Sequence, residues 1–188
     1  YGGELTSAAI NKYVYIAVKR RFDDSLRVSY NKTEIVDDVA QLQHPIVRET
    51  LRLLGLSQGL EIISIGDVPA NTGLGSSGSF TVALLLALHT FKGEHRTPQE
   101  LAEESFTIQA DILGEPIGKQ DEYMAAYGGV TNLLIDQVGG VIAQPVLMPS
   151  GVVQEFEHDL LLFYTGIQRK ASDILAEQGK AVRSQQVT

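Results

Sequence analysis

The sequence predicts an α+β fold, in which strands and helices are mixed without strict alternation. Segments 13–19, 26–30 and 60–65 are short and rich in β-branched or aromatic residues, as is typical of strands. Longer segments carry apolar residues at helical spacing. A doubly wound sheet would place a helix after each strand, but here the first two strands follow each other directly.

The N-terminal third should contain a hairpin, a helix and a strand. Residues 13–19 and 26–30, joined by a charged turn, predict an antiparallel hairpin. A helix is expected from Pro45, because proline suits the first helical position and Gly55 stands just beyond the apolar pattern. Residues 60–65 should form the next strand.

Two helices are expected in the middle of the chain. Segment 80–91 is apolar on every side, which predicts a helix buried centrally. Thr97-Pro98-Gln99-Glu100 has the pattern of a capping box with proline at the first helical position, and its helix should run to about Leu113. A shorter helix is expected at 120–127.

The last third should begin with a second hairpin. Segments 130–135 and 141–146 flank Gly139-Gly140, which is a hairpin signal. A strand is expected at 159–164 and a helix from Ser172 onward. A boundary near residues 149–151 would separate a domain at 1–150 from the beginning of a second domain at 151–188.

Composition favours a cytoplasmic enzyme. Fifteen Lys and Arg against 23 Asp and Glu give the 188 residues a net charge of −8, which argues against nucleic acid or anionic membrane as a partner. There is no cysteine, so neither disulfides nor thiol chemistry is expected. The longest apolar stretch, 80–88, is far shorter than the ~20 residues of a membrane span. The first residues do not resemble a natural start, so we expect the chain to begin inside a longer product.

A glycine- and serine-rich segment, Pro69-Ala-Asn-Thr-Gly-Leu-Gly-Ser-Ser-Gly-Ser79, joins the expected strand at 60–65 to the helix expected from Phe80. Glycines let the backbone approach an anion, and the first amides of the following helix supply donors. The serine hydroxyls can bind phosphate or a phosphate-bound magnesium ion. The segment therefore predicts a phosphate-binding loop, although such loops also occur as ordinary turns before helices.

Two other phosphate-binding motifs fit less well. A Walker loop is absent, and its nearest match, 114–120, is one residue short and ends in Gln. The dinucleotide fingerprint matches Gly73, Gly75 and Gly78, but a polar connector separates these glycines from the strand. The segment that should carry a ribose-binding acid, 91–97, is a polar loop.

A second segment, Gly118-Lys119-Gln120-Asp121, could supply a catalytic carboxylate. Phosphoryl transfer to a hydroxyl benefits from a carboxylate that takes the acceptor's proton and from cations that offset charge. Asp121, beside Lys119 and a glycine loop, suits the role of base. An aspartate near a helix start can equally be an N-cap.

The residues from Pro69 to Ser79 resemble the second motif of the GHMP small-molecule kinases, which usually have Ala where Gly78 stands. Segment 118–129 resembles the acceptor-site segment of their sugar-phosphate branch, in which the aspartate is the proposed base. The resemblance implies a fold like the second domain of ribosomal protein S5, with 151–188 as the start of a ferredoxin-like C-terminal domain.

Further matches at 1–15 and 161–175 resemble the D-glycero-D-manno-heptose 7-phosphate kinases of bacterial surface-polysaccharide (lipopolysaccharide) synthesis. That resemblance implies ATP and Mg²⁺ as cofactors and transfer of the γ-phosphate to the anomeric hydroxyl of a sugar phosphate. It assigns nucleotide contacts to Pro69, Gly73, Leu74, Gly75, Ser76, Ser77, Gly78 and Ser79. It assigns acceptor contacts to Asp121, Tyr123, Gly128 and Gly129.

The metal site implied by the resemblance departs from the family pattern. Ser77 corresponds to a magnesium ligand, but the usual glutamate is replaced by Gln109, which offers an oxygen without charge. Asp111 could take over. The family's first and third motifs are absent, so we expect a chain cut at both ends, with possible homodimers formed through exposed apolar surface. If the whole protein also lacks the third motif, we expect little or no turnover.

Three alternatives remain open at the sequence level. A GHMP kinase with a fucose- or mevalonate-type acceptor would share the nucleotide motif. A non-catalytic GHMP-like sensor would be favoured by Gln109. A dinucleotide-dependent oxidoreductase would bind a nicotinamide cofactor and show no preference for ATP.

Overall fold

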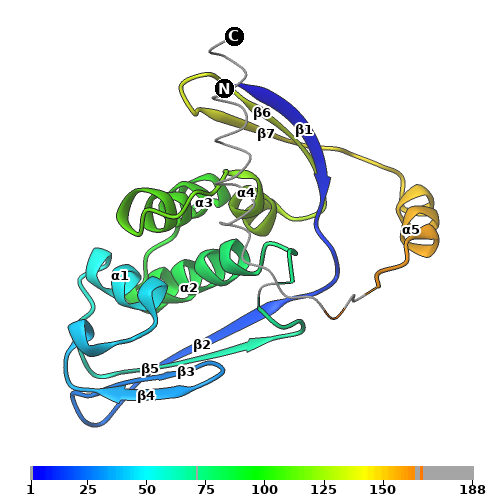
Figure 1. Cartoon of the computed structure of the whole chain (residues 1–188). Coiled ribbons are helices and arrows are strands. Elements are labelled where there is room, and N and C mark those ends of the chain that lie inside the picture. Colours follow the sequence, from blue (N-terminus) through cyan, green and yellow to red (C-terminus); the bar gives the residue numbers. More distant parts are fainter. Residues whose placement is uncertain (1, 71, 164–165, 167–188) are drawn as a thin grey trace.

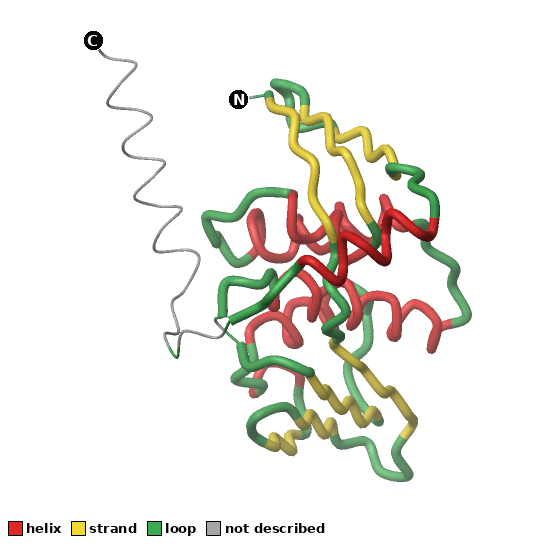
Figure 2. Tube along the Cα trace, turned by 90° about the vertical axis from the view of Figure 1, so that its right-hand side faces the viewer, coloured by secondary structure: helices red, strands yellow, loops and turns green. Residues whose placement is uncertain are grey.

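The computed structural model describes residues 2–70, 72–163 and 166. Its main helices lie between two separate sheets, one of three strands and one of four (Figure 1). The side view shows the same order of layers, with strands at both ends and helices between them (Figure 2). This mixed arrangement confirms the predicted α+β class.

The four-stranded sheet has the order β2-β5-β3-β4. Its strands are β2 (Val14–Arg20), β3 (Leu26–Ser29), β4 (Thr33–Val36) and β5 (Leu60–Gly66). The predicted hairpin of 13–19 with 26–30 is wrong, because β5 lies between β2 and β3, antiparallel to the first and parallel to the second. The 20–25 turn is therefore wide, and the backbone of Gly59 bonds to Arg21 and Asp24 within it.

The three-stranded sheet has the order β1-β6-β7, antiparallel throughout, and consists of β1 (Gly3–Ala8), β6 (Val130–Ile135) and β7 (Val141–Pro145). The predicted hairpin across Gly139-Gly140 is confirmed. The edge strand β1 was not predicted. Its sequence, Gly-Glu-Leu-Thr-Ser-Ala, is poor in strand-forming residues, and it becomes a strand by pairing with β6, more than 120 residues away.

The helices begin largely where the sequence predicts. They are α1 (Pro45–Leu53), α2 (Ser76–Lys92), α3 (Pro98–Phe106) and α4 (Gln120–Tyr127), with a short 3-10 turn η1 (Val39–Gln41) before α1. The capping box of α3 is confirmed, since the amides of Thr97 and Glu100 each bond to the other residue's side chain. After Phe106 the helical run continues as a π-helix, η2 (Thr107–Ile112).

Helix α2 lies at the centre of the fold, as predicted. Leu84 and Leu88 pack in the core between α2, α1 and the four-stranded sheet. Val82 and Leu85 pack on α3 and η2. The helix begins at Ser76, earlier than the Phe80 expected from the sequence, so part of the glycine-serine loop forms its first turn.

The chain after β7 differs from the prediction. A helix, α5 (Ser150–Asp159), precedes the segment where a strand was expected, and residues 160–163 have no regular structure. The predicted strand depended on the apolar residues at 160–163, but the structure leaves their side chains exposed. No residue of α5 is buried either, so no packing against the core determines the conformation of this segment. The predicted helix from Ser172 lies outside the described residues. The domain boundary near 149–151 stays a prediction.

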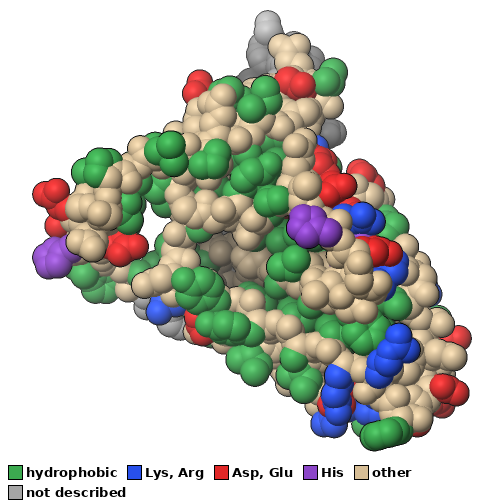
Figure 3. Space-filling model, turned by 180° about the vertical axis from the view of Figure 1, so that it is seen from behind, with side chains coloured by type: hydrophobic (Ala, Val, Ile, Leu, Met, Phe, Trp, Pro, Cys, Tyr) green, Lys and Arg blue, Asp and Glu red, His purple; other side chains and the backbone are tan. Residues whose placement is uncertain are grey.

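The outer face of the molecule has apolar and basic regions. From behind, hydrophobic side chains run along the four-stranded sheet and basic side chains gather at the end where β2 turns toward β3 (Figure 3). Lys19 and Arg27 there pair with the buried carboxylate of Glu61 at 3.0 and 3.2 Å. Within the described residues, none of the helices has the length and apolar character that crossing a bilayer requires.

Candidate functional site

The glycine-serine loop follows β5 and is fixed to the sheet at its start. Asp67 exchanges two hydrogen bonds with the backbone of Tyr13, at 2.8 and 3.0 Å. Pro69 and Leu74 are exposed, and the Pro69 carbonyl accepts from the Thr72 hydroxyl. The connector is therefore tied to β2 before the chain turns into α2.

Left-handed glycines make the turn into α2. Gly73 and Gly75 have φ of 78° and 66°, a region that other residues enter only with strain. Gly75 is the N-cap of α2, and its carbonyl accepts the first helical bond, from Ser79. The amides of the intervening first turn, residues 76–78, have no acceptor within the helix. Such amides, together with the helix dipole, favour a bound anion.

Helix α4 packs its first turn directly against this loop. A Cβ atom built on Gly75 would lie 3.0 Å from Cγ of Asp121. One built on the buried Gly78 would lie 3.2 Å from the backbone carbonyl carbon of Asp121 and from the amide nitrogen of Glu122. An alanine at position 78, the residue usual in the family, would therefore press on the backbone of α4.

This packing changes the acidity of Asp121. Burial raises the pKa of its carboxyl above the ordinary value. A higher pKa makes the carboxylate a stronger proton acceptor, which suits a general base. Its neighbour in the sequence, Lys119, does not supply the expected positive charge. Its ammonium binds both carboxylate oxygens of Glu103 and the carbonyl of Gly139, and lies over the ring of Phe106.

The two residues expected to bind metal are brought together. The hydroxyl of Ser77 donates to Oε1 of Gln109 at 2.6 Å. The amide nitrogen of Gln109 donates to Oε1 of Glu122 at 3.0 Å and to the hydroxyl of Ser105 at 3.2 Å. Both Gln109 and Glu122 are 2% exposed, so a buried polar chain leads from the first turn of α2 to α4.

These oxygens fit a magnesium site only in part. Magnesium prefers oxygen ligands and is commonly bound by one or two carboxylates together with substrate phosphates. Ser77 and Gln109 provide neutral oxygens. The carboxylate of Glu122 is joined to this pair through the hydrogen bond that it accepts from the Gln109 amide. In the described part of the chain, no group of three or more His, Asp or Glu could hold a metal. Asp111 is exposed on η2.

The other three residues expected at the acceptor site have surroundings different from those of Asp121. Tyr123 is fully buried, and its hydroxyl donates to Glu103, so its position favours packing over contact with a ligand. Gly128 and Gly129 end α4, seven and eight residues after Asp121, which is roughly 10 Å along the helix. Their carbonyls accept from the hydroxyl of Thr131 and the amide of Ala9.

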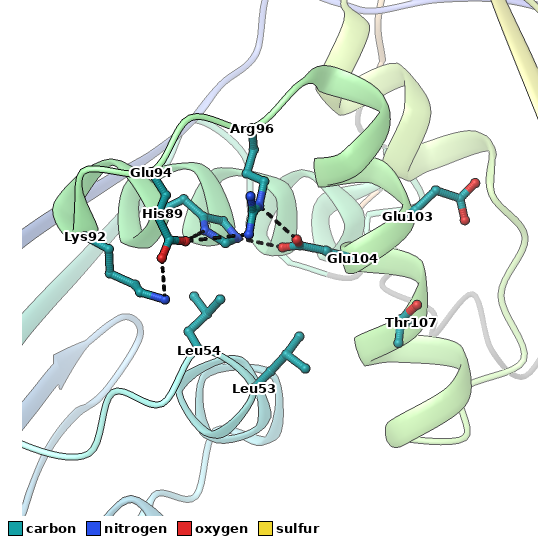
Figure 4. Close-up of a pocket in the computed structure, with 9 residues that line it drawn as sticks. All are labelled: Leu53, Leu54, His89, Lys92, Glu94, Arg96, Glu103, Glu104 and Thr107. Atoms are coloured by element: carbon teal, nitrogen blue, oxygen red, sulfur yellow. Dashed lines mark hydrogen bonds and ion pairs between the residues drawn. The ribbon is translucent and has the colours of Figure 1, made fainter.

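A separate pocket of about 430 Å³ opens between α1, α2 and α3 (Figure 4). The imidazole of His89, which is 1% exposed, lies between the carboxylates of Glu94 and Glu104, at 2.7 Å from each. Lys92 and Arg96 pair with the same two carboxylates. Because these side chains already pair with one another, this pocket offers a ligand fewer unpaired polar groups than the first turn of α2 does.

Sequence reasoning missed Glu122 as part of the site. Its only signal was an acidic residue beside the expected base, and that is also an ordinary feature of a helix first turn. The contact with Gln109 joins residues 13 apart through the packing of η2 on α4. Burial raises the pKa of the Glu122 carboxyl to about 7.

Comparison with known proteins identifies the family. The family model described as GHMP kinases N terminal domain matches residues 30–129. A D-glycero-alpha-D-manno-heptose 7-phosphate kinase of Campylobacter jejuni is 26% identical over 190 residues, which cover 93% of this chain and 55% of that protein. An L-fucokinase/L-fucose-1-P guanylyltransferase of Bacteroides fragilis is 29% identical over 130 residues, covering 67% of this chain and 13% of that protein.

A solved structure shares the fold. The crystal structure of a D-glycero-D-manno-heptose 1-phosphate kinase from Bacteroides thetaiotaomicron superposes with a TM-score of 0.76 at 26% identity, covering 84% of this chain and 55% of that one. The chain belongs to the GHMP kinase family and contains its N-terminal domain. It spans about half the length of these heptose kinases.

The close approach of α2 and α4 can be tested at Gly75. Gly75→Ala would place an alanine in the left-handed helical region, which costs about 1 kcal/mol, and would bring its Cβ against Asp121. Gly93→Ala is the matched control, because Gly93 ends the same helix at φ 77° and its Cβ would meet nothing within 4 Å. Urea unfolding of the intact protein should show a loss for Gly75→Ala larger by roughly 1 kcal/mol. Equal losses would contradict the packing.

The acidity of Glu122 predicts a pH dependence of stability. Its pKa of about 7 in the fold exceeds the ordinary 4.5, so its stabilising contribution is complete below about pH 4.5 and is lost as pH rises through 7. The free energy of unfolding should fall by up to about 3 kcal/mol over this interval. Urea unfolding of metal-free protein measures it. Glu122→Gln should flatten the decline, whereas Asp37→Asn, at an exposed position, should keep it.

Proposed function

We propose that this domain belongs to a kinase that transfers the γ-phosphate of ATP to the anomeric hydroxyl of D-glycero-D-manno-heptose 7-phosphate. The observation that carries the proposal is the packing of Asp121 on Gly75 and Gly78, which holds a carboxylate with raised pKa beside the first-turn amides of α2. The similarity to two heptose phosphate kinases supports the acceptor class.

The chemistry would divide between the two helix N-termini. The amides of residues 76–78 and the hydroxyls of Ser76 and Ser77 would bind the phosphates. The carboxylate of Asp121 would take the proton of the acceptor hydroxyl as its oxygen bonds to the γ-phosphorus and the bond to ADP breaks. Magnesium, when bound, would offset phosphate charge, held by the oxygens of Ser77 and Gln109.

The remaining expectations are part of the same proposal. A sugar phosphate and ATP as substrates would place the reaction in the cytoplasm, and the acceptor would be a small molecule. Gly128 and Gly129 are the other residues of segment 118–129 that could line the acceptor side. Homodimer formation stays a prediction.

The proposed base can be tested by Asp121→Asn, which keeps the size of the side chain but removes its ability to take a proton. Transfer from magnesium-ATP to heptose 7-phosphate by the intact protein should fall by about 10²- to 10⁴-fold, with nucleotide affinity retained. Asp37→Asn, the same chemical change at an exposed position, should leave the rate unchanged.

The outcomes separate the proposal from its alternatives. Activity retained in Asp121→Asn would contradict the role of the base. Transfer to L-fucose or mevalonate, and not to the heptose, would keep the kinase and change the acceptor. Tight ATP binding without transfer to any of these acceptors would favour a sensor. Binding of a nicotinamide cofactor in place of ATP would overturn the kinase proposal.

A further inference from the structure

Lys119 is an unusual residue for the start of a helix. It is the N-cap of α4, a position that favours Asn, Asp, Ser or Thr, and its side chain makes no capping hydrogen bond. Its positive charge also adds to the positive end of the helix dipole, which is unfavourable. Breaks of a local rule of this kind are expected mainly at functional or strained sites.

The side chain of Lys119 instead ties α4 to two neighbouring elements. Its ammonium lies 2.8 and 2.7 Å from the two carboxylate oxygens of Glu103 on α3, and 2.7 Å from the carbonyl of Gly139 in the β6–β7 turn. It also lies 4.9 Å from the centre of the Phe106 ring. The lysine side chain is 15% exposed, so salt screens these contacts less than it would at an open surface.

Glu103 holds the same side of α4 one turn further along. Tyr123, four residues after Lys119, donates its hydroxyl to the same carboxylate. Lys119 and Tyr123 therefore fix one side of α4 against α3. Successive residues of an α-helix are turned by about 100°, so Asp121 lies about 200° from Lys119, on the other side of α4. That side faces the glycine-serine loop.

We propose that Lys119 is a positioning residue, which sets the rotation of α4 about its own axis and thereby holds the side chain of Asp121 against the first turn of α2. The proposal rests on the proposed function, in which Asp121 is the base. Without the contact to Glu103, α4 could turn and carry Asp121 away from the loop. Misplacement of a reacting group by about 1 Å can cost about 100-fold in rate.

Amide NMR spectra of the ligand-free, isotope-labelled protein test the rotation without any assay of activity. Lys119→Met keeps the length of the side chain but removes the charge that binds Glu103. The amide signals of Gly75 and Gly78, which lie across α4 from the substitution, should shift. Glu103→Gln, which removes the partner's charge, should shift the same two signals. Lys119→Arg can still pair with the carboxylate and should leave them near their wild-type positions.

A double-variant cycle on the intact protein tests the catalytic consequence. Lys119→Met should lower kcat for transfer from magnesium-ATP to heptose 7-phosphate by about 10-fold or more, with nucleotide affinity unchanged. In an Asp121→Asn background the same change should cost less than about threefold, because residues that act as a unit are not additive. Lys32→Met, the same substitution at an exposed position in the β3–β4 turn, should behave as wild type in the spectra and the assay.

Several results would overturn the inference. Signal changes confined to α3 and the β6–β7 turn would show that the contacts of Lys119 do not reach the loop. An equal loss of kcat with and without the Asp121 carboxylate would indicate a merely structural residue. Wild-type kcat in Lys119→Met would remove the catalytic role. If the wild type transferred no phosphate to the heptose, the proposed function would fail, and the spectra would still decide whether Lys119 holds Asp121 in place.

Discussion

The structure depends on the close approach of two helix N-termini. The first turn of α2 packs on the first turn of α4, so a Cβ atom at Gly75 or Gly78 would press on Asp121 or on the backbone beside it. Two positive helix ends therefore meet at one place, which is electrostatically unfavourable without anions nearby. Asp121 and Glu122, both in the first turn of α4, place two carboxyl groups at this junction.

The rest of the fold holds this junction in place. Helix α2 is buried on both faces, between the four-stranded sheet and α3, so its N-terminus cannot easily move away from α4. On the other side, Glu103 of α3 binds Lys119 and Tyr123 at the first turn of α4. Lys119 and Tyr123 thus tie the helix that carries Asp121 to α3.

Local features of the site were predictable from the sequence. The glycine-serine loop, the capping box of α3 and the end of α4 at Gly128 depend on backbone conformations that neighbouring residues determine. The features that were missed depend on contacts between distant segments. The insertion of β5 beside β3, the pairing of Lys119 with Glu103, and the contact of Glu122 with Gln109 are of this kind. No local pattern encodes them.

Amide NMR spectra of the intact, isotope-labelled protein test the central claim most directly, during titration with magnesium and a non-hydrolysable ATP analogue. If the junction is the phosphate site, the amides of Ser76, Ser77 and Gly78 should shift most, together with those of Asp121 and Glu122. If the largest shifts instead appear around His89 and Arg96 while the first turn of α2 stays unchanged, the account is contradicted.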